Sequence, residues 1–119
     1  MTISTHVLDT MRGAPAAGLA VTLSRREPDG DWKVIGEEVT DADGRVKRLN
    51  EDELEVGEYR LDFATRPYFE RSGLSAFYPE VSVVFSVEDP SGHVHVPLLL
   101  ISFLTLLALQ KQLAWCCLS

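Results

Sequence analysis

Short runs of alternating apolar and polar residues constrain the fold of this 119-residue chain more than any other feature. In residues 19–24, 59–63 and 81–87, an apolar side chain occupies every second position or nearly so. A period of two buries one face of a strand and exposes the other, as in an antiparallel sandwich. The pattern therefore predicts an all-β fold made of antiparallel strands in two sheets.

Turn signals separate these runs and support the same fold. Glycine, proline and aspartate gather at residues 13–15, 28–31 and 41–44, and a further glycine closes residues 55–57. This spacing is typical of a sandwich or barrel. One short helix is expected at residues 68–73, where Gly73 would end it.

Composition excludes several classes of protein. Hydrophobic residues make up 45% of the chain and charged residues 24%, which is ordinary for a soluble domain. The formal net charge of -7 repels phosphate backbones, so we expect no nucleic acid partner. The first residues lack a secretory pattern, and the adjacent Cys116 and Cys117 form neither a disulfide framework nor a zinc motif. A cytoplasmic location is the default expectation.

The composition changes abruptly near residue 96. Residues 96–119 hold more leucines than the 95 residues before them, and Lys111 is their single charged residue. The uncharged run from Val96 to Leu109 is shorter than the roughly 20 residues that span a bilayer as a helix, so no membrane anchor is expected. We predict a domain over residues 1–100 and an atypical apolar tail over 101–119. Because the tail's leucines do not alternate, we expect it to be poorly packed or helical.

The chain's three histidines are candidates for chemistry. His93 and His95 belong to one strand-like segment, where residues two apart point to the same face, and His6 lies at the start of the first strand. Each histidine taken singly is more often a hydrogen-bonded surface or core residue. A same-face pair also suits a metal, but no cysteine or carboxylate motif accompanies it, so no metal is predicted.

Arg45 is the candidate anion-binding residue. The segment Asp41–Arg45 resembles the start of a calcium loop but lacks the later glycine and glutamate that such a loop needs. A turn that leads into a strand is the better interpretation. Beyond such a turn, a guanidinium is either a solvated charge or a group aimed at a planar anionic ligand.

Seven motifs along the chain together resemble the 5-hydroxyisourate hydrolase family. They occur in the family's order and cover most of the chain, whereas each alone is weakly specific. They are His6–Asp9, Gly13–Ala16, Asp43–Arg45, Gly57–Leu61, Tyr68–Phe69, Phe77–Val81 and His93–Leu100.

The resemblance implies a transthyretin-like antiparallel β-sandwich that forms a homotetramer with active sites between dimers and uses no cofactor. It also implies an activity, the hydrolysis of 5-hydroxyisourate to 2-oxo-4-hydroxy-4-carboxy-5-ureidoimidazoline in urate catabolism. The matching catalytic positions are His6, Arg45 and His95, of which His6 and Arg45 would also bind the substrate. These residue types suit the reaction, because a neutral imidazole can deprotonate water and a guanidinium can stabilise an oxyanion.

The tail departs from the family, which ends in Tyr-Arg-Gly-Ser. That motif is absent here, and residues 101–119 contain no tyrosine, arginine or histidine. We therefore expect a replaced C-terminus that supplies no catalytic group. Three alternatives stay open: a ligand-binding module like transthyretin, an immunoglobulin-like interaction domain, and a catalytically impaired paralogue.

Overall fold

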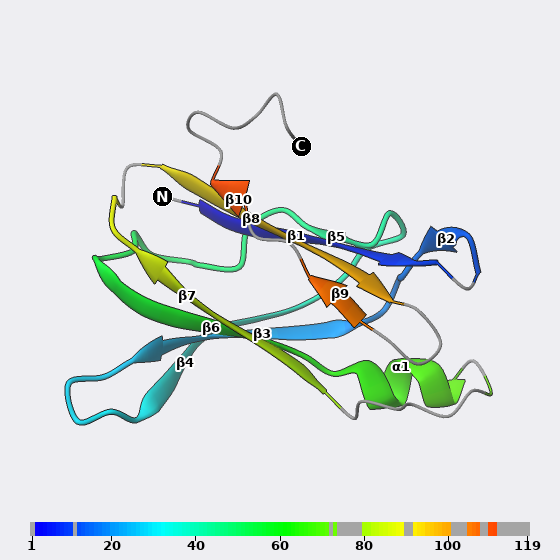
Figure 1. Ribbon diagram of the computed structural model, residues 1–119, viewed down its shortest axis with the longest axis horizontal. Helices are drawn as coiled ribbons and strands as arrows, with labels where there is room; N and C mark the ends of the chain where they lie inside the picture. The colour runs from blue at the N-terminus through cyan, green and yellow to red at the C-terminus, as the bar shows by residue number, and fades with distance from the viewer. Residues whose placement is uncertain are drawn as a thin grey trace.

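Two β-sheets face each other, with one helix at an end of the sandwich (Figure 1). The computed structural model describes residues 2–10, 12–71, 73, 80–89, 92–100, 105–107 and 110–111. Within these ranges the elements are β1 Thr2–Asp9, β2 Ala14–Pro15, β3 Ala20–Arg26, β4 Trp32–Val39, β5 Arg45–Val46, β6 Gly57–Phe63, α1 Thr65–Arg71, β7 Val81–Val87, β8 His93–Leu100, β9 Thr105–Leu107 and β10 Gln110–Lys111.

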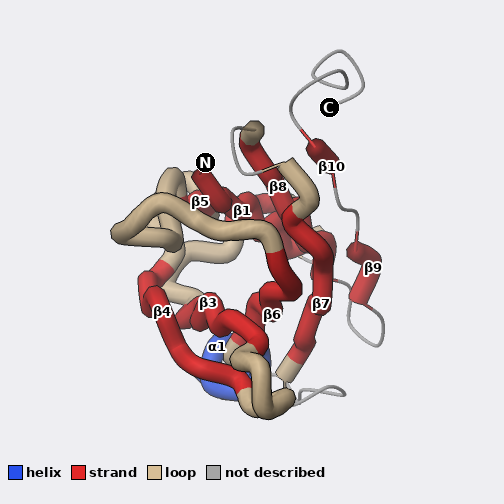
Figure 2. Tube along the Cα trace, turned by 90° about the vertical axis from the view of Figure 1, so that its left-hand side faces the viewer, coloured by secondary structure: helices blue, strands red, loops and turns tan. Residues whose placement is uncertain are grey.

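Each sheet has a simple strand order. The first sheet runs β10-β8-β1-β2, with β5 also paired to β1 and β9 to β8, and the second runs β4-β3-β6-β7. In Figure 2, which views the molecule from another side, β1, β5 and β8 lie above β3, β4 and β6, with α1 behind. The predicted all-β sandwich with one short helix is confirmed. The pairing of β1 with β8 is parallel, a detail that the alternation of residues could not predict.

The core lies between the sheets and follows the predicted alternation. Leu19, Val21 and Leu23 are at most 1% exposed, and Tyr59, Leu61 and Phe63 are fully buried. Burying a side chain of this size stabilises the fold by about 1.5–3 kcal/mol. The opposite sheet contributes Ile3, Val7, Val94, Val96 and Leu98.

The helix begins earlier than predicted. It was expected at residues 68–73, but α1 spans Thr65–Arg71 and buries Thr65, Tyr68 and Phe69. Pro67 lies in its first turn, where a missing N–H costs no helical hydrogen bond, so the helix can start before the proline. Gly73 has a φ of 76° and donates its N–H to the carbonyl of Glu70, which confirms the predicted glycine stop.

Part of the apolar tail is extended, so the expectation of a helix is wrong for its described residues. β9 pairs antiparallel with residues 98–100 of β8, and β10 pairs with residues 94–95. An open sheet edge offers unpaired N–H and C=O groups that any extended segment can bind, whatever its side-chain pattern. The rest of 101–119, both cysteines included, lies outside the described residues, as do Phe77, Tyr78 and Pro79 of one family motif. No helix in the described part of the chain is long and apolar enough to cross a membrane.

Candidate active site

Alternation along β1 and β8 places three histidines on the outer face of the first sheet. Ile3, Thr5 and Val7 are buried in the core, so Ser4 and His6 point to the opposite face. In β8 the buried residues are Val94, Val96 and Leu98, which directs His93 and His95 to that same outer face.

Arg45 reaches this face through a tight turn. The Asp41 carboxylate accepts the N–H groups of Asp43 at 2.8 Å and Arg45 at 3.0 Å, and the Arg45 N–H bond is the main reason why the pKa of Asp41 is lowered. Gly44 has a φ of 74°, and its carbonyl accepts the N–H of Val7 at 2.7 Å. A Cβ at Gly44 would lie 2.3 Å from the Val7 carbonyl oxygen, so only glycine lets the turn approach β1 this closely.

The register brings the three predicted site residues together. Arg45 pairs directly with His6 across β5 and β1, which places their Cβ atoms roughly 5 Å apart. Across β1 and β8, His95 pairs with Ser4 and Pro97 with His6, so His95 is a diagonal neighbour of His6. Three residues remote in sequence therefore share one patch of one sheet face. Their catalytic roles stay a prediction.

Ser4 lies between two of the histidines and was not singled out from the sequence. Its hydroxyl is 3.0 Å from Nε2 of His93 and 2.9 Å from Nδ1 of His95. The sequence shows that Ser4 is two residues before His6 and therefore on the same face of the strand. It does not show which residue of β8 lies opposite Ser4, and the pairing of β1 with β8 is what places Ser4 beside His95.

The electrostatics of the patch favour neutral imidazoles. Burial lowers the pKa of His95, and the nearby positive charges of His93, His6 and Arg45 lower it further. Burial also lowers the pKa of His93. Both rings are therefore neutral at neutral pH, which is the state in which an imidazole accepts a proton. Among the described residues, no carboxylate forms an ion pair with Arg45.

Metal binding has no support in the described ranges. They contain no group of three or more histidine, cysteine, aspartate or glutamate side chains placed to hold an ion. The Asp41–Arg45 turn uses its first carboxylate on backbone N–H groups, as a turn does, rather than presenting it to a cation.

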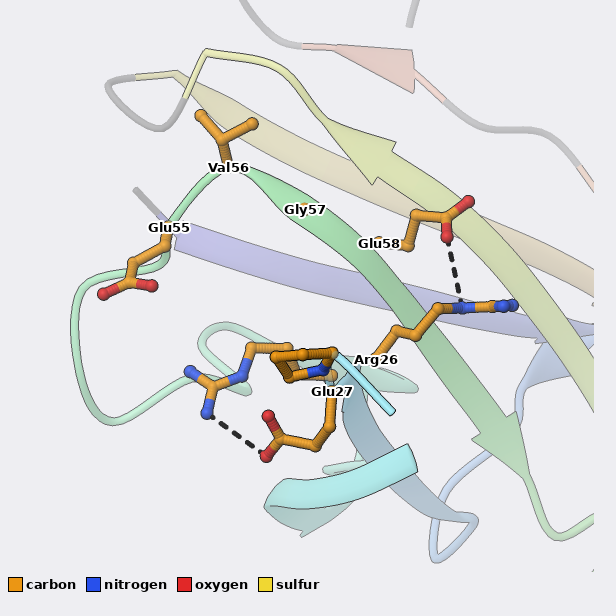
Figure 3. Close-up of a pocket in the computed structure, with 8 residues that line it drawn as sticks. Arg26, Glu27, Glu55, Val56, Gly57 and Glu58 are labelled. Carbon is orange, nitrogen blue, oxygen red and sulfur yellow. Dashed lines mark ion pairs between the residues drawn. The ribbon is translucent and has the colours of Figure 1, made fainter. Parts of the chain in front are cut away.

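A hollow of about 530 Å³ lies away from this patch, between the β3–β4 hairpin and the start of β6 (Figure 3). Four of its charged residues form two ion pairs: Arg26 Nε lies 3.1 Å from Glu58 and Arg25 lies 3.5 Å from Glu27. It is lined by no histidine. The hollow therefore offers two ion pairs and the Glu55 carboxylate, but none of the three predicted site residues.

The fold and the patch together define a class of protein: a β-sandwich with a histidine–arginine site on the outer face of one sheet. Comparison with other proteins identifies this class. The chain belongs to the HIUase/Transthyretin family, whose profile matches residues 3–104. It is 42% identical over 100 residues to the 5-hydroxyisourate hydrolase of Mus musculus, covering 82% of this chain and 85% of that protein. It is 41% identical over 99 residues to the enzyme of the same name from Salmonella dublin, covering 82% and 72%.

Solved structures agree with these relatives. The 5-hydroxyisourate hydrolase of Klebsiella pneumoniae superposes with a TM-score of 0.81 at 30% identity, covering 92% of this chain and 99% of that one. Sea bream transthyretin in complex with thyroxine superposes with a TM-score of 0.87 at 29% identity, covering 93% and 96%. The same fold thus occurs in proteins named as hydrolases and in a transthyretin solved in complex with thyroxine, so the fold alone does not decide the function.

Proposed function

We propose that this protein hydrolyses 5-hydroxyisourate to 2-oxo-4-hydroxy-4-carboxy-5-ureidoimidazoline, a step of urate catabolism. The observation that carries the proposal is the convergence of His6, Arg45 and His95 on one sheet face, in a chain whose relatives are named for this reaction. A carrier of apolar ligands has no need of this combination of two imidazoles and a guanidinium.

The chemistry follows from the state of these groups. A neutral histidine takes a proton from water as the water oxygen attacks the acyl carbon of the substrate ring. Arg45 stabilises the negative charge that develops on the carbonyl oxygen and also holds the electron-rich ring. The carbon–nitrogen bond then breaks, its electron pair stays on nitrogen, and that nitrogen takes up the proton. The reaction involves no change of oxidation state.

We also propose that the protein acts as a homotetramer, the assembly that its family resemblance implies. The outer face that holds the site is available for contact between chains, because its imidazoles are only partly buried in the single chain. Sedimentation analysis should give the mass of four 13.2 kDa chains. A monomeric mass in a fully active sample would contradict this assembly.

Residues 101–119 are proposed to add no catalytic group, because they lack the tyrosine and arginine of the family's Tyr-Arg-Gly-Ser ending. The test exchanges this segment for a family-type ending and compares turnover and mass in solution. A gain in turnover would support a site that works below its full capacity. Equal turnover and an equal, clean tetramer would show that the native tail is sufficient.

The proposed activity has a direct assay. Freshly generated 5-hydroxyisourate decays spontaneously, and its ultraviolet absorbance is followed with and without the protein. The protein should accelerate the decay, and His95→Ala at equal concentration should remove most of that acceleration. If the folded parent protein did not accelerate the decay, the proposed hydrolysis would be contradicted and a ligand-binding function would be favoured.

A further inference from the structure

The Ser4 hydroxyl makes two hydrogen bonds to ring nitrogens but carries a single proton. It lies 2.9 Å from Nδ1 of His95 and 3.0 Å from Nε2 of His93. A hydroxyl donates one hydrogen bond and accepts others, so Ser4 can donate to one imidazole and must accept from the other. The protonation of one ring therefore dictates that of its neighbour.

Only two arrangements of protons satisfy both contacts when the rings are neutral. In the first, Ser4 donates to Nδ1 of His95, so the proton of His95 lies on Nε2 and His93 donates from its own Nε2. In the second, Ser4 donates to Nε2 of His93, so His93 keeps its proton on Nδ1 and His95 donates from Nδ1. The second arrangement leaves Nε2 of His95 without a proton.

We propose that Ser4 is a positioning residue that holds His95 in the second arrangement, with Nδ1 protonated and Nε2 free to act as the base. The catalytic part of this inference rests on the proposed hydrolysis, because a base needs a bare nitrogen that faces its substrate. Nδ1 of His95 is directed to Ser4, and Nε2 makes no hydrogen bond within the described part of the chain. Nε2 is therefore the nitrogen that a water molecule can reach.

The hydroxyl also links His95 to a second proton acceptor. When Nε2 of His95 takes the proton of the attacking water, its Nδ1 proton can pass to Ser4 while the Ser4 proton passes to Nε2 of His93. His93 then holds the positive charge until the carbon–nitrogen bond breaks. Reversal of both transfers returns a proton to Nδ1 of His95, and the Nε2 proton of His95 moves to the leaving nitrogen. Every group ends in its starting state.

A hydroxyl suits this role better here than a carboxylate would. A carboxylate beside His95 would stabilise the imidazolium and raise the pKa of the ring. Ser4 is neutral, and burial lowers the pKa of both His95 and His93, so both rings stay neutral and either can receive the proton. Ser4 itself is 9% exposed, which limits competition from bulk water for its hydrogen bonds.

The test compares the full chain with Ser4→Ala and Ser4→Thr, the second of which keeps a hydroxyl and suits a strand. Nitrogen-15 NMR of the imidazoles at a pH above 7.5 reports which ring nitrogen carries the proton. In the parent protein and Ser4→Thr, both His93 and His95 should carry it on Nδ1. In Ser4→Ala both should move toward the Nε2-protonated form that free imidazole side chains prefer.

Kinetics give the second readout. Ser4→Ala should lower kcat on the order of 10- to 100-fold, the scale seen when an outer hydrogen-bond partner of a functional histidine is lost, with KM little changed. Ser4→Thr should restore most of the rate. A parent His95 protonated on Nε2, or a Ser4→Ala protein with parental kcat, would overturn the inference. Absence of turnover in the parent would remove the proposed function, while the nitrogen signals would still decide the tautomer.

Discussion

Both sheets bury apolar residues on their inner faces, but they differ in the chemistry of their outer faces. On the second sheet, charged groups neutralise one another: Arg60 lies 2.9 Å from Asp62, and Arg26 lies 3.1 Å from Glu58. Both arginines also lie over the ring of Trp32, with guanidinium carbons 4.7 and 4.8 Å from its centre. Such a face is stable and solvated but has no reactive group to offer.

The outer face of the first sheet is arranged differently. The rings of His93 and His95 are linked by a hydroxyl, and Arg45 lies beside His6 without a carboxylate partner among the described residues. Both outer faces carry polar groups, so the comparison teaches that a site is recognised by the polar groups that are left available for a ligand.

The largest effect is expected from the histidines of the first face. His6→Ala and His95→Ala should each lower kcat/KM by on the order of 10²-fold or more, the usual contribution of a positioned acid or base. Both positions are only partly buried, so the variants should stay folded by circular dichroism. Steady-state ultraviolet kinetics measure the loss. A folded variant with less than a tenfold loss would remove that residue from the site.

The turn that carries Arg45 should be more sensitive than a turn of the other sheet. Gly44→Ala combines a positive φ with a Cβ 2.3 Å from the Val7 carbonyl oxygen, and should lower the free energy of unfolding by more than about 2 kcal/mol. Gly30→Ala, with a φ of 93° and open space, should cost only about 1 kcal/mol. Urea unfolding measures both. Turnover should fall for Gly44→Ala alone, and equal effects would mean that the turn does not position Arg45.

The pH dependence sharpens the account of His95. Because burial and the charges of His93, His6 and Arg45 lower its pKa below 6.5, the neutral base should persist as the pH falls through 6.5. The acidic limb of kcat/KM should therefore have its midpoint below 6.5. The stability of the fold should depend on pH in the same direction. As the pH falls, His95 takes up a proton in the unfolded state at a higher pH than in the folded state, so stability decreases below about pH 6.5. A midpoint above 6.5 would contradict the neutral assignment.

The smallest effect is expected on the second face. Trp32→Ala removes stacking with Arg26 and Arg60 and should lower the free energy of unfolding by only about 1 kcal/mol, the scale of exposed cation–π contacts. The rate of hydrolysis should stay within about twofold of the parent. A large loss of turnover in this variant would show that the second face takes part in catalysis.

Much of this architecture could be predicted from the sequence, because alternation reports directly which strand face is buried. Leu19, Val21 and Leu23 lie in the core as expected, and the family motifs pointed to His6, Arg45 and His95. Pairing between strands far apart in sequence carries no such signal. The parallel contact of β1 with β8, and hence the place of Ser4 between two histidines, needed the structure.

Boundaries were the weaker part of the prediction. The start of α1 was missed because its first turn is held by the burial of Thr65 against the core, which a local pattern does not reveal. The described strands of the tail were missed for a related reason: backbone pairing to β8, and not side-chain alternation, makes β9 and β10 extended. The division into residues 1–100 and 101–119 stays a prediction, although the family match ends nearby, at residue 104.

The most direct test of the central claim compares Arg45→Ala with Arg60→Ala in the ultraviolet decay of freshly generated 5-hydroxyisourate. Both changes remove a guanidinium from the outer face of a sheet, and Arg60→Ala also removes an ion pair with Asp62 and a contact with Trp32. Arg45→Ala should lose on the order of 10²-fold in kcat/KM, as expected when an oxyanion-stabilising donor is removed, while Arg60→Ala keeps the parental rate. Equal rates for the two folded variants, or a loss confined to Arg60→Ala, would contradict the assignment of the site to the first sheet.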